Sequence, residues 1–185
     1  MTKNLKYSLI LLSICAVCAF ALALTNSVTA PVIVRLDLER KNQALEAVSA
    51  GYTFGDQEMV EGNKYVTYLI DLTDNGELVG YILGLQSAGY GGQITLVASY
   101  ALSGELLAAQ VLNHSETPGL GAKAADASYM DKFMGTGSDK AVPTSKDMLS
   151  DSDAQSVSGA SVTFTAVGKA IDAGSAYVKA LGGTK

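Results

Sequence analysis

Three hydroxyl residues near the end of the sequence, Ser158, Ser161 and Thr163, are spaced so that they could surround a phosphate group. Gly159 and Ala160 lie between them, and such small residues let a ligand approach the backbone closely. An amphipathic helical pattern follows directly, and a helix N-terminus offers unpaired N–H groups and a positive dipole end to an anion. The same residues also fit an ordinary serine N-cap with a glycine turn, so both interpretations stay open at this point.

The helix that would carry this motif covers residues 161–181. Its apolar residues recur at steps of three and four, which predicts one stripe packed against a sheet. Gly182 and Gly183 are expected to end the helix. The stripe consists of Phe164, Val167, Ile171, Gly174, Val178 and Leu181.

Four segments rich in β-branched, aromatic and other apolar residues predict two antiparallel hairpins, with turns at residues 73–76 and 103–104. The predicted fold class is α+β: a small antiparallel sheet packed with helices and preceded by one N-terminal transmembrane helix. The four strands are expected at residues 65–72, 77–85, 93–100 and 105–112.

Between the second hairpin and the final helix, a short helix is expected over residues 124–134. Its inward face would consist of Tyr129, Met130 and Phe133. The polar stretch that follows, residues 135–157, predicts a loop that holds one short strand.

Two loops contain glycines where a ligand could approach. Residues 89–92, Gly-Tyr-Gly-Gly, fit a close backbone approach and a plain flexible connector equally well. Residues 114–121, His-Ser-Glu-Thr-Pro-Gly-Leu-Gly, contain a Pro-Gly pair that favours a type II turn. We expect Glu116 and Thr117 to order this turn rather than to act as an acid or base. His114 could donate or accept a hydrogen bond to a ligand or within its own loop.

The N-terminal segment has the composition of a membrane anchor. Residues 7–24 carry no charge, and this length reaches the lower limit for a spanning helix. Lys3 and Lys6 precede it, which predicts a cytoplasmic N-terminus and an extracytoplasmic domain, single-pass in the plasma membrane. A cleaved signal peptide is the alternative, because residues 21–23 fit a cleavage site. A retained anchor is favoured because a helical pattern continues through residues 32–45.

These features divide the chain into residues 1–25, the cytoplasmic segment and anchor, residues 26–50, a linker helix that Gly51 ends, and an extracytoplasmic domain at residues 51–185. Cys15 and Cys18 both lie in the apolar run, so the domain has no disulfide. The net charge of −5 excludes nucleic acid as a partner, and a single histidine excludes most histidine-based metal sites, so none is predicted.

In this order and behind an anchor, the motifs at residues 89–92, 114–121 and 158–163 resemble the FMN-binding domain family. The resemblance is to the form found in G subunits of Rnf complexes and, more distantly, in C subunits of the sodium-pumping NADH:quinone oxidoreductase. In that family a flavin transferase moves FMN from FAD onto a side-chain hydroxyl, which gives a phosphoester. The family pattern has threonine where this chain has Ser161 and aspartate where it has Gln155, with Asp153 nearby.

The resemblance implies that Ser161 is the covalent FMN acceptor, with Thr163 as the second choice. It also implies that the two glycine-containing loops approach the flavin ring. The cofactor-binding residues implied besides these two hydroxyls are Ser158, Gly159, Ala160, Gly91, Gly92, His114, Glu116, Thr117, Gly119 and Leu120.

The function implied is that of an electron-transfer subunit, not a self-contained enzyme, in a membrane-bound ion-translocating ferredoxin:NAD-type oxidoreductase complex. Its partners would be the other integral membrane and redox subunits, and a flavin transferase for maturation. Two alternatives are an anchored binding or assembly module without flavin, and a stand-alone flavin-bearing domain that serves another reductase.

Overall fold

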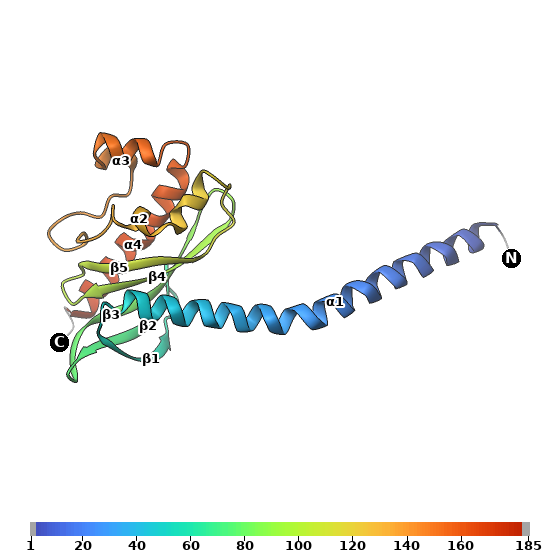
Figure 1. Ribbon diagram of the computed structural model, residues 1–185, viewed down its shortest axis with the longest axis horizontal. Coiled ribbons are helices and arrows are strands. Elements are labelled where there is room, and N and C mark those ends of the chain that lie inside the picture. Colours follow the sequence, from blue (N-terminus) through green and yellow to red (C-terminus); the bar gives the residue numbers. More distant parts are fainter. Residues whose placement is uncertain (1–2, 183–185) are drawn as a thin grey trace. The chain divides into compact units, whose positions relative to one another are not determined.

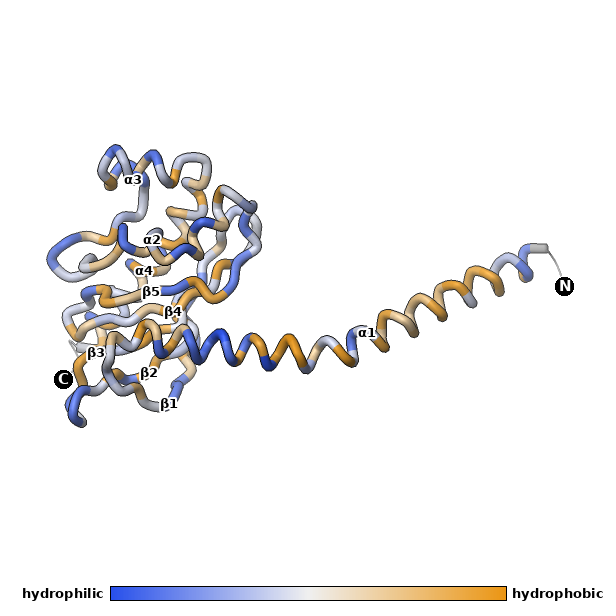
Figure 2. Tube along the Cα trace, viewed as in Figure 1, coloured by the Kyte–Doolittle hydropathy of each residue, from blue (hydrophilic) through white to orange (hydrophobic). Residues whose placement is uncertain are grey.

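The computed structural model describes residues 3–182 and divides the chain into two compact units, with the division between Lys41 and Asn42. Helix α1 (Lys3–Val48) makes up the described part of the first unit and contributes its last residues to the second (Figure 1). Hydrophobic residues line most of its N-terminal part (Figure 2). The helix is long and apolar enough to cross a membrane, as the sequence predicts.

The second unit is built on a five-stranded antiparallel sheet in which each strand pairs with the next along the chain. The four predicted strands are all present. The first strand was missed, because its sequence, Thr-Phe-Gly-Asp-Gln-Glu-Met, is polar and it lies almost fully exposed at one edge. The strands are β1 (Thr53–Met59), β2 (Val66–Asp74), β3 (Glu77–Ala88), β4 (Gln93–Ala101) and β5 (Leu106–Asn113).

Both faces of the sheet are covered. Helix α4 (Ser161–Gly182) packs on one face, chiefly against β3 and β4, and its stripe from Phe164 to Val178 is buried as predicted. The other face packs against Ala44, Leu45 and Val48 at the end of α1. Side chains alternate between faces along a strand, and this alternation is what divides the core into two clusters. Gly183, one of the two glycines expected to end α4, lies outside the described residues.

The segment between β5 and α4 differs in part from the sequence prediction. Helix α2 (Ala127–Met130) and the 3₁₀ helix η1 (Gly121–Ala125) replace the single helix expected over residues 124–134, although Tyr129, Met130 and Phe133 are buried as predicted. The short strand expected within residues 135–157 is wrong. That stretch contains the 3₁₀ helix η2 (Lys146–Met148) and helix α3 (Asp151–Ser156).

Helix α3 forms there because its start carries helix-favouring groups. The Ser150 hydroxyl accepts a hydrogen bond from the Asp153 N–H, and Asp151 and Asp153 place negative charge in the first turn. Asp153, the carboxylate nearest to the family's aspartate position, accepts a hydrogen bond from the Ser150 hydroxyl at 2.7 Å.

Candidate functional site

Within residues 3–182, no side chain caps the N-terminus of α4. Helix α4 begins at Ser161, so the N-cap position is Ala160, which has no side-chain oxygen to offer the first N–H groups. The Ala160 carbonyl accepts the first helical bond, from Phe164 at 3.0 Å. Gly159 precedes it with φ of +82°, a backbone conformation that a side chain would strain. The serine-cap interpretation is therefore wrong for this helix, and within residues 3–182 no side chain binds its first N–H groups, which are available to an anion.

This helix start forms one wall of a cavity of about 510 Å³. The loop at residues 114–121 contributes Glu116, Thr117, Leu120 and Gly121 to its lining, and the loop at residues 89–92 contributes Tyr90. Three apolar side chains of the wall are well exposed, Tyr90 at 76%, Val162 at 53% and Leu120 at 47%, so a ligand would find apolar surface here. The lining consists of Tyr90, Glu116, Thr117, Leu120, Gly121, Gly159, Ala160, Ser161, Val162 and Thr163.

The two candidate acceptor hydroxyls differ in their surroundings. Thr163 is 1% exposed, and its hydroxyl donates a hydrogen bond to Oε2 of Glu116. Ser161 is half-buried, and within residues 3–182 its hydroxyl has no hydrogen-bond partner. Of the two, Ser161 is therefore the hydroxyl that a group in the cavity can reach.

Glu116 joins the three sequence motifs. Its side chain is buried, with 6% exposed, and its Oε1 accepts a hydrogen bond from the Gly91 N–H at 2.8 Å while Oε2 accepts from Thr163. A buried carboxylate needs such donors to offset its lost hydration. The role of Glu116 is therefore wider than the predicted ordering of its own turn, because it holds the residue 89–92 loop and the first turn of α4 in one network.

Glycines are required where these motifs meet. A Cβ on Gly91 would overlap the carbonyl oxygen of Ser115, and a Cβ on Gly121 would lie 2.6 Å from Thr163 Oγ1 and 2.7 Å from Glu116 Oε2. Close approach, rather than flexibility, explains these positions. Gly119 has φ of +77°, as a type II Pro-Gly turn requires.

Tyr129 lies close to Glu116, and its hydroxyl is buried. That hydroxyl has no hydrogen-bond partner within residues 3–182. Burial, and to a lesser degree the negative charge of Glu116, raises the pKa of Tyr129 well above its ordinary value. The phenol therefore stays neutral beside the carboxylate.

The structure brings together some of the sequence-predicted residues and leaves others apart. His114 acts within its own loop, since its Nδ1 accepts a hydrogen bond from the Glu116 N–H at 3.2 Å. Tyr90, Gly121 and Val162 were not among the predicted site residues, although each lies inside a motif that the sequence singled out. The predicted residues that do not line the cavity are Gly91, Gly92, His114, Gly119 and Ser158.

Comparison with known proteins gives a consistent result. Residues 89–175 match the FMN-binding domain, which confirms the resemblance seen in the motifs. The chain is 30% identical over 177 residues to the G subunit of the Na⁺-translocating ferredoxin:NAD⁺ oxidoreductase complex of Acetobacterium woodii, and the match covers 88% of this chain and 85% of that protein.

Two further relatives carry similar names. The G subunit of the proton-translocating ferredoxin:NAD⁺ oxidoreductase complex of Clostridium ljungdahlii is 26% identical over 170 residues, 92% of this chain and 85% of that protein. The G subunit of the ion-translocating oxidoreductase complex of Methanosarcina acetivorans is 29% identical over 175 residues, 90% of each chain. All three alignments span nearly the whole length of both proteins.

Proposed function

Since the chain belongs to the FMN-binding domain family, we propose that it is a membrane-anchored flavoprotein subunit that relays electrons through FMN held on Ser161. It would act within an ion-translocating ferredoxin:NAD-type oxidoreductase complex, as the names of its relatives suggest. The apolar part of α1 would serve as the anchor, with the N-terminus in the cytoplasm and residues 51–185 outside it. The other subunits of the complex would be its partners.

The cavity beside Ser161 fits FMN in size and chemistry. Its volume of about 510 Å³ lies in the range of about 300–1,000 Å³ that is usual for small-molecule sites. Tyr90, Leu120 and Val162 offer apolar surface to a flat ring, while the uncapped start of α4 offers N–H groups to a phosphate. Gly159 and Gly121 in the wall leave room for the ligand.

The observation that carries the proposal is the difference between two neighbouring hydroxyls at the start of α4. The half-buried Ser161 hydroxyl has no hydrogen-bond partner within residues 3–182, whereas the Thr163 hydroxyl donates to Glu116. In the attachment step, the Ser161 oxygen would bond to the flavin-side phosphorus of FAD. The pyrophosphate P–O bond would break, AMP would leave and the hydroxyl proton would pass to solvent. A flavin transferase would catalyse this step.

When bound, FMN supplies a ring that accepts and returns electrons. The residues of this chain position it. Glu116 fixes the distance between the loop at residues 89–92 and the first turn of α4, and Tyr90 offers the ring an apolar side chain in the cavity lining. An ester bond would keep the cofactor in place in a compartment that supplies no free FMN.

Mass spectrometry of the full chain, co-expressed with a flavin transferase, tests the proposal. We expect an FMN adduct on the peptide that contains Ser161, its loss in Ser161→Ala and its retention in Ser161→Thr. Thr163→Ser, which keeps a hydroxyl toward Glu116, is the matched control and should keep the adduct on Ser161. An adduct on Thr163, or no adduct even in Ser161→Thr, would overturn the assignment.

Co-purification tests the role in a complex. Tagged full-length protein is expected to bring down integral membrane subunits of an oxidoreductase complex. A flavinylated chain that purifies alone from its native membrane would support the stand-alone flavin domain instead.

A further inference from the structure

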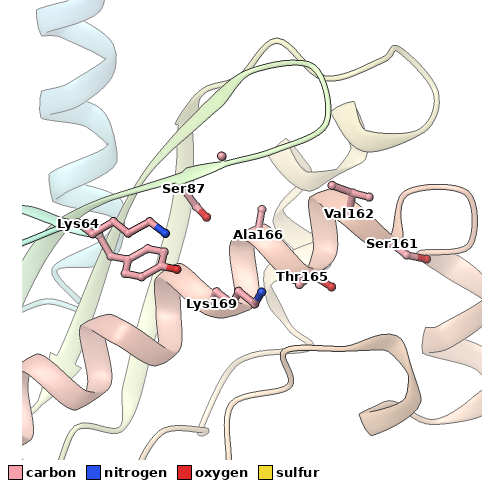
Figure 3. Close-up of a pocket in the computed structure, with 9 residues that line it drawn as sticks. Lys64, Ser87, Ser161, Val162, Thr165, Ala166 and Lys169 are labelled. Atoms are coloured by element: carbon pink, nitrogen blue, oxygen red, sulfur yellow. The ribbon is translucent and has the colours of Figure 1, made fainter.

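Ser161 also lines a second cavity. Its volume is about 420 Å³, and it lies between α4 and the end of β3 with the loop before β2. Figure 3 shows Lys64 and Ser87 on the sheet side and Thr165 and Lys169 along α4. Its lining consists of Lys64, Tyr65, Ser87, Ala88, Ser161, Val162, Thr165, Ala166 and Lys169.

The charge of this cavity is opposite to that of the chain. The sequence has 18 acidic and 13 basic residues, yet the described lining contains two lysines and no acidic residue. Within residues 3–182, neither Lys64 nor Lys169 forms an ion pair. The two ammonium groups are therefore available to an anion.

Helical spacing aligns the polar groups of α4 with the acceptor hydroxyl. Ser161, Thr165 and Lys169 follow one another at four-residue intervals, so they lie along one face of the helix. Side chains of an α-helix lean toward its N-terminus. Lys169 therefore leans toward Thr165, one turn nearer the start of the helix.

Hydrogen bonds fix the backbone around Lys64. Asn63 Oδ1 accepts hydrogen bonds from the N–H groups of Tyr65 and Val66, both at 2.9 Å, and the Gln86 side chain donates to the Lys64 carbonyl at 3.2 Å. The Lys64 ammonium lies 5.2 Å from the centre of the Tyr65 ring, a cation–π contact.

We infer that this cavity is an anion site for the phosphate of the cofactor ester on Ser161, with Lys169 and Lys64 as its counter-charges and Thr165 as a hydrogen-bond donor. A phosphodiester keeps one negative charge at neutral pH, and lysine is a common partner for phosphate. The phosphate would then lie at the end of this cavity nearest the start of α4, with the two ammonium groups further along the same cavity, and the flavin ring would occupy the cavity lined by Tyr90. The inference rests on the proposed attachment to Ser161.

The test compares the melting temperatures of loaded and unloaded full-length chain in nonionic detergent, the unloaded form being expressed without the transferase. Each pair is measured at ~0.01 M and ~1 M salt, where charges are screened over about 30 Å and 3 Å. Exposed charge pairs are weak, so we expect the stabilisation by loading in the wild type to fall by about 1–4 °C between the two salt concentrations.

Charge variants decide whether the two lysines cause this effect. In Lys64→Gln/Lys169→Gln the stabilisation by loading should be smaller and nearly independent of salt, and Lys169→Arg should restore part of the salt dependence. Lys179→Gln removes an exposed lysine of α4 that lies outside this cavity, so it should behave as the wild type.

Three outcomes would overturn the inference. A double variant with unchanged salt dependence would show that the lysines do not face the phosphate. Inorganic phosphate that stabilises Ser161→Ala through the same lysines would assign the cavity to a free anion. A wild-type chain without any flavin adduct would overturn the proposed function together with this inference, whereas the first two outcomes leave that function intact.

Discussion

The two cavities that share Ser161 and Val162 are built in different ways. The cavity lined by Tyr90 has a wall of buried hydrogen bonds, in which Glu116 binds both Gly91 and Thr163. The lining of the cavity beside Lys169 includes two long, exposed side chains, Lys64 and Lys169, that form no ion pair within residues 3–182. The Glu116 wall therefore fixes the geometry of the site as part of the folded core. The lysines of the other cavity supply charge that can be changed without disturbing the fold.

The largest expected effect comes from removing the buried carboxylate. Glu116→Ala leaves the Thr163 hydroxyl buried without an acceptor and also frees the Gly91 N–H, so we expect a loss of about 2–4 kcal/mol in unfolding free energy. Glu116→Gln keeps the volume but offers one oxygen to two donors, and should lose about 1–2 kcal/mol. Denaturant unfolding of the unloaded full-length chain in detergent measures both.

The matched change in the other cavity is Lys169→Ala. An exposed lysine without an ion pair contributes little to stability, so the unfolding free energy should stay within about 0.5 kcal/mol of the wild type. Equal losses in Glu116→Ala and Lys169→Ala would contradict the contrast between the two walls.

Substitutions at two glycines of one loop distinguish the cost of local backbone strain from the cost of a clash inside the cavity wall. Gly119→Ala places a side chain at φ of +77° with open space around it, and should cost about 1–2 kcal/mol. Gly121→Ala instead pushes a Cβ against Thr163 and Glu116, and should cost about 1–3 kcal/mol.

The readout that distinguishes these variants is flavin occupancy by intact mass. Gly121 lines the cavity and Gly119 does not, so only Gly121→Ala should lower the occupied fraction. A comparable loss of flavin in Gly119→Ala would mean that the turn itself, and not the Glu116 network, shapes the cavity.

Much of the fold follows from local patterns in the sequence. Four strands and α4 were predicted because their periodicity and turn residues act over short distances. Strand β1 was missed because a polar edge strand depends on its neighbour for its conformation. The strand predicted within residues 135–157 is wrong because the Ser150 hydroxyl caps helix α3 there.

The site was predictable in its parts but not in its connections. The motif around Ser161 and the loop containing Glu116 were both identified from residue types. The two motifs are joined by the hydrogen bond between Thr163 and Glu116. These residues lie 47 positions apart, so no local sequence pattern predicts their contact. The cavity beside Lys169 was missed for the same reason, since Lys64 reaches it only once β2 and β3 pair.

The smallest expected effect concerns the phenol of Tyr129, which lies close to Glu116. Tyr129→Phe removes a buried hydroxyl that has no partner within residues 3–182, so at pH 8 the unfolding free energy should change by at most about 1 kcal/mol. Burial and the Glu116 charge raise the pKa of Tyr129 in the folded state. Its contribution to stability is therefore complete below the unfolded value, about 10, and is lost as the pH rises above it.

The wild type should thus lose stability above about pH 10, because Tyr129 ionises in the unfolded chain while burial keeps it neutral in the folded one. Burial also raises the pKa of Tyr68 to about 12, so this loss has more than one source. Tyr129→Phe should lose less stability than the wild type between pH 8 and pH ~10.5. Identical alkaline slopes in wild type and Tyr129→Phe would show that the phenol beside Glu116 reaches water, and that the wall around Glu116 is more open than its hydrogen bonds indicate.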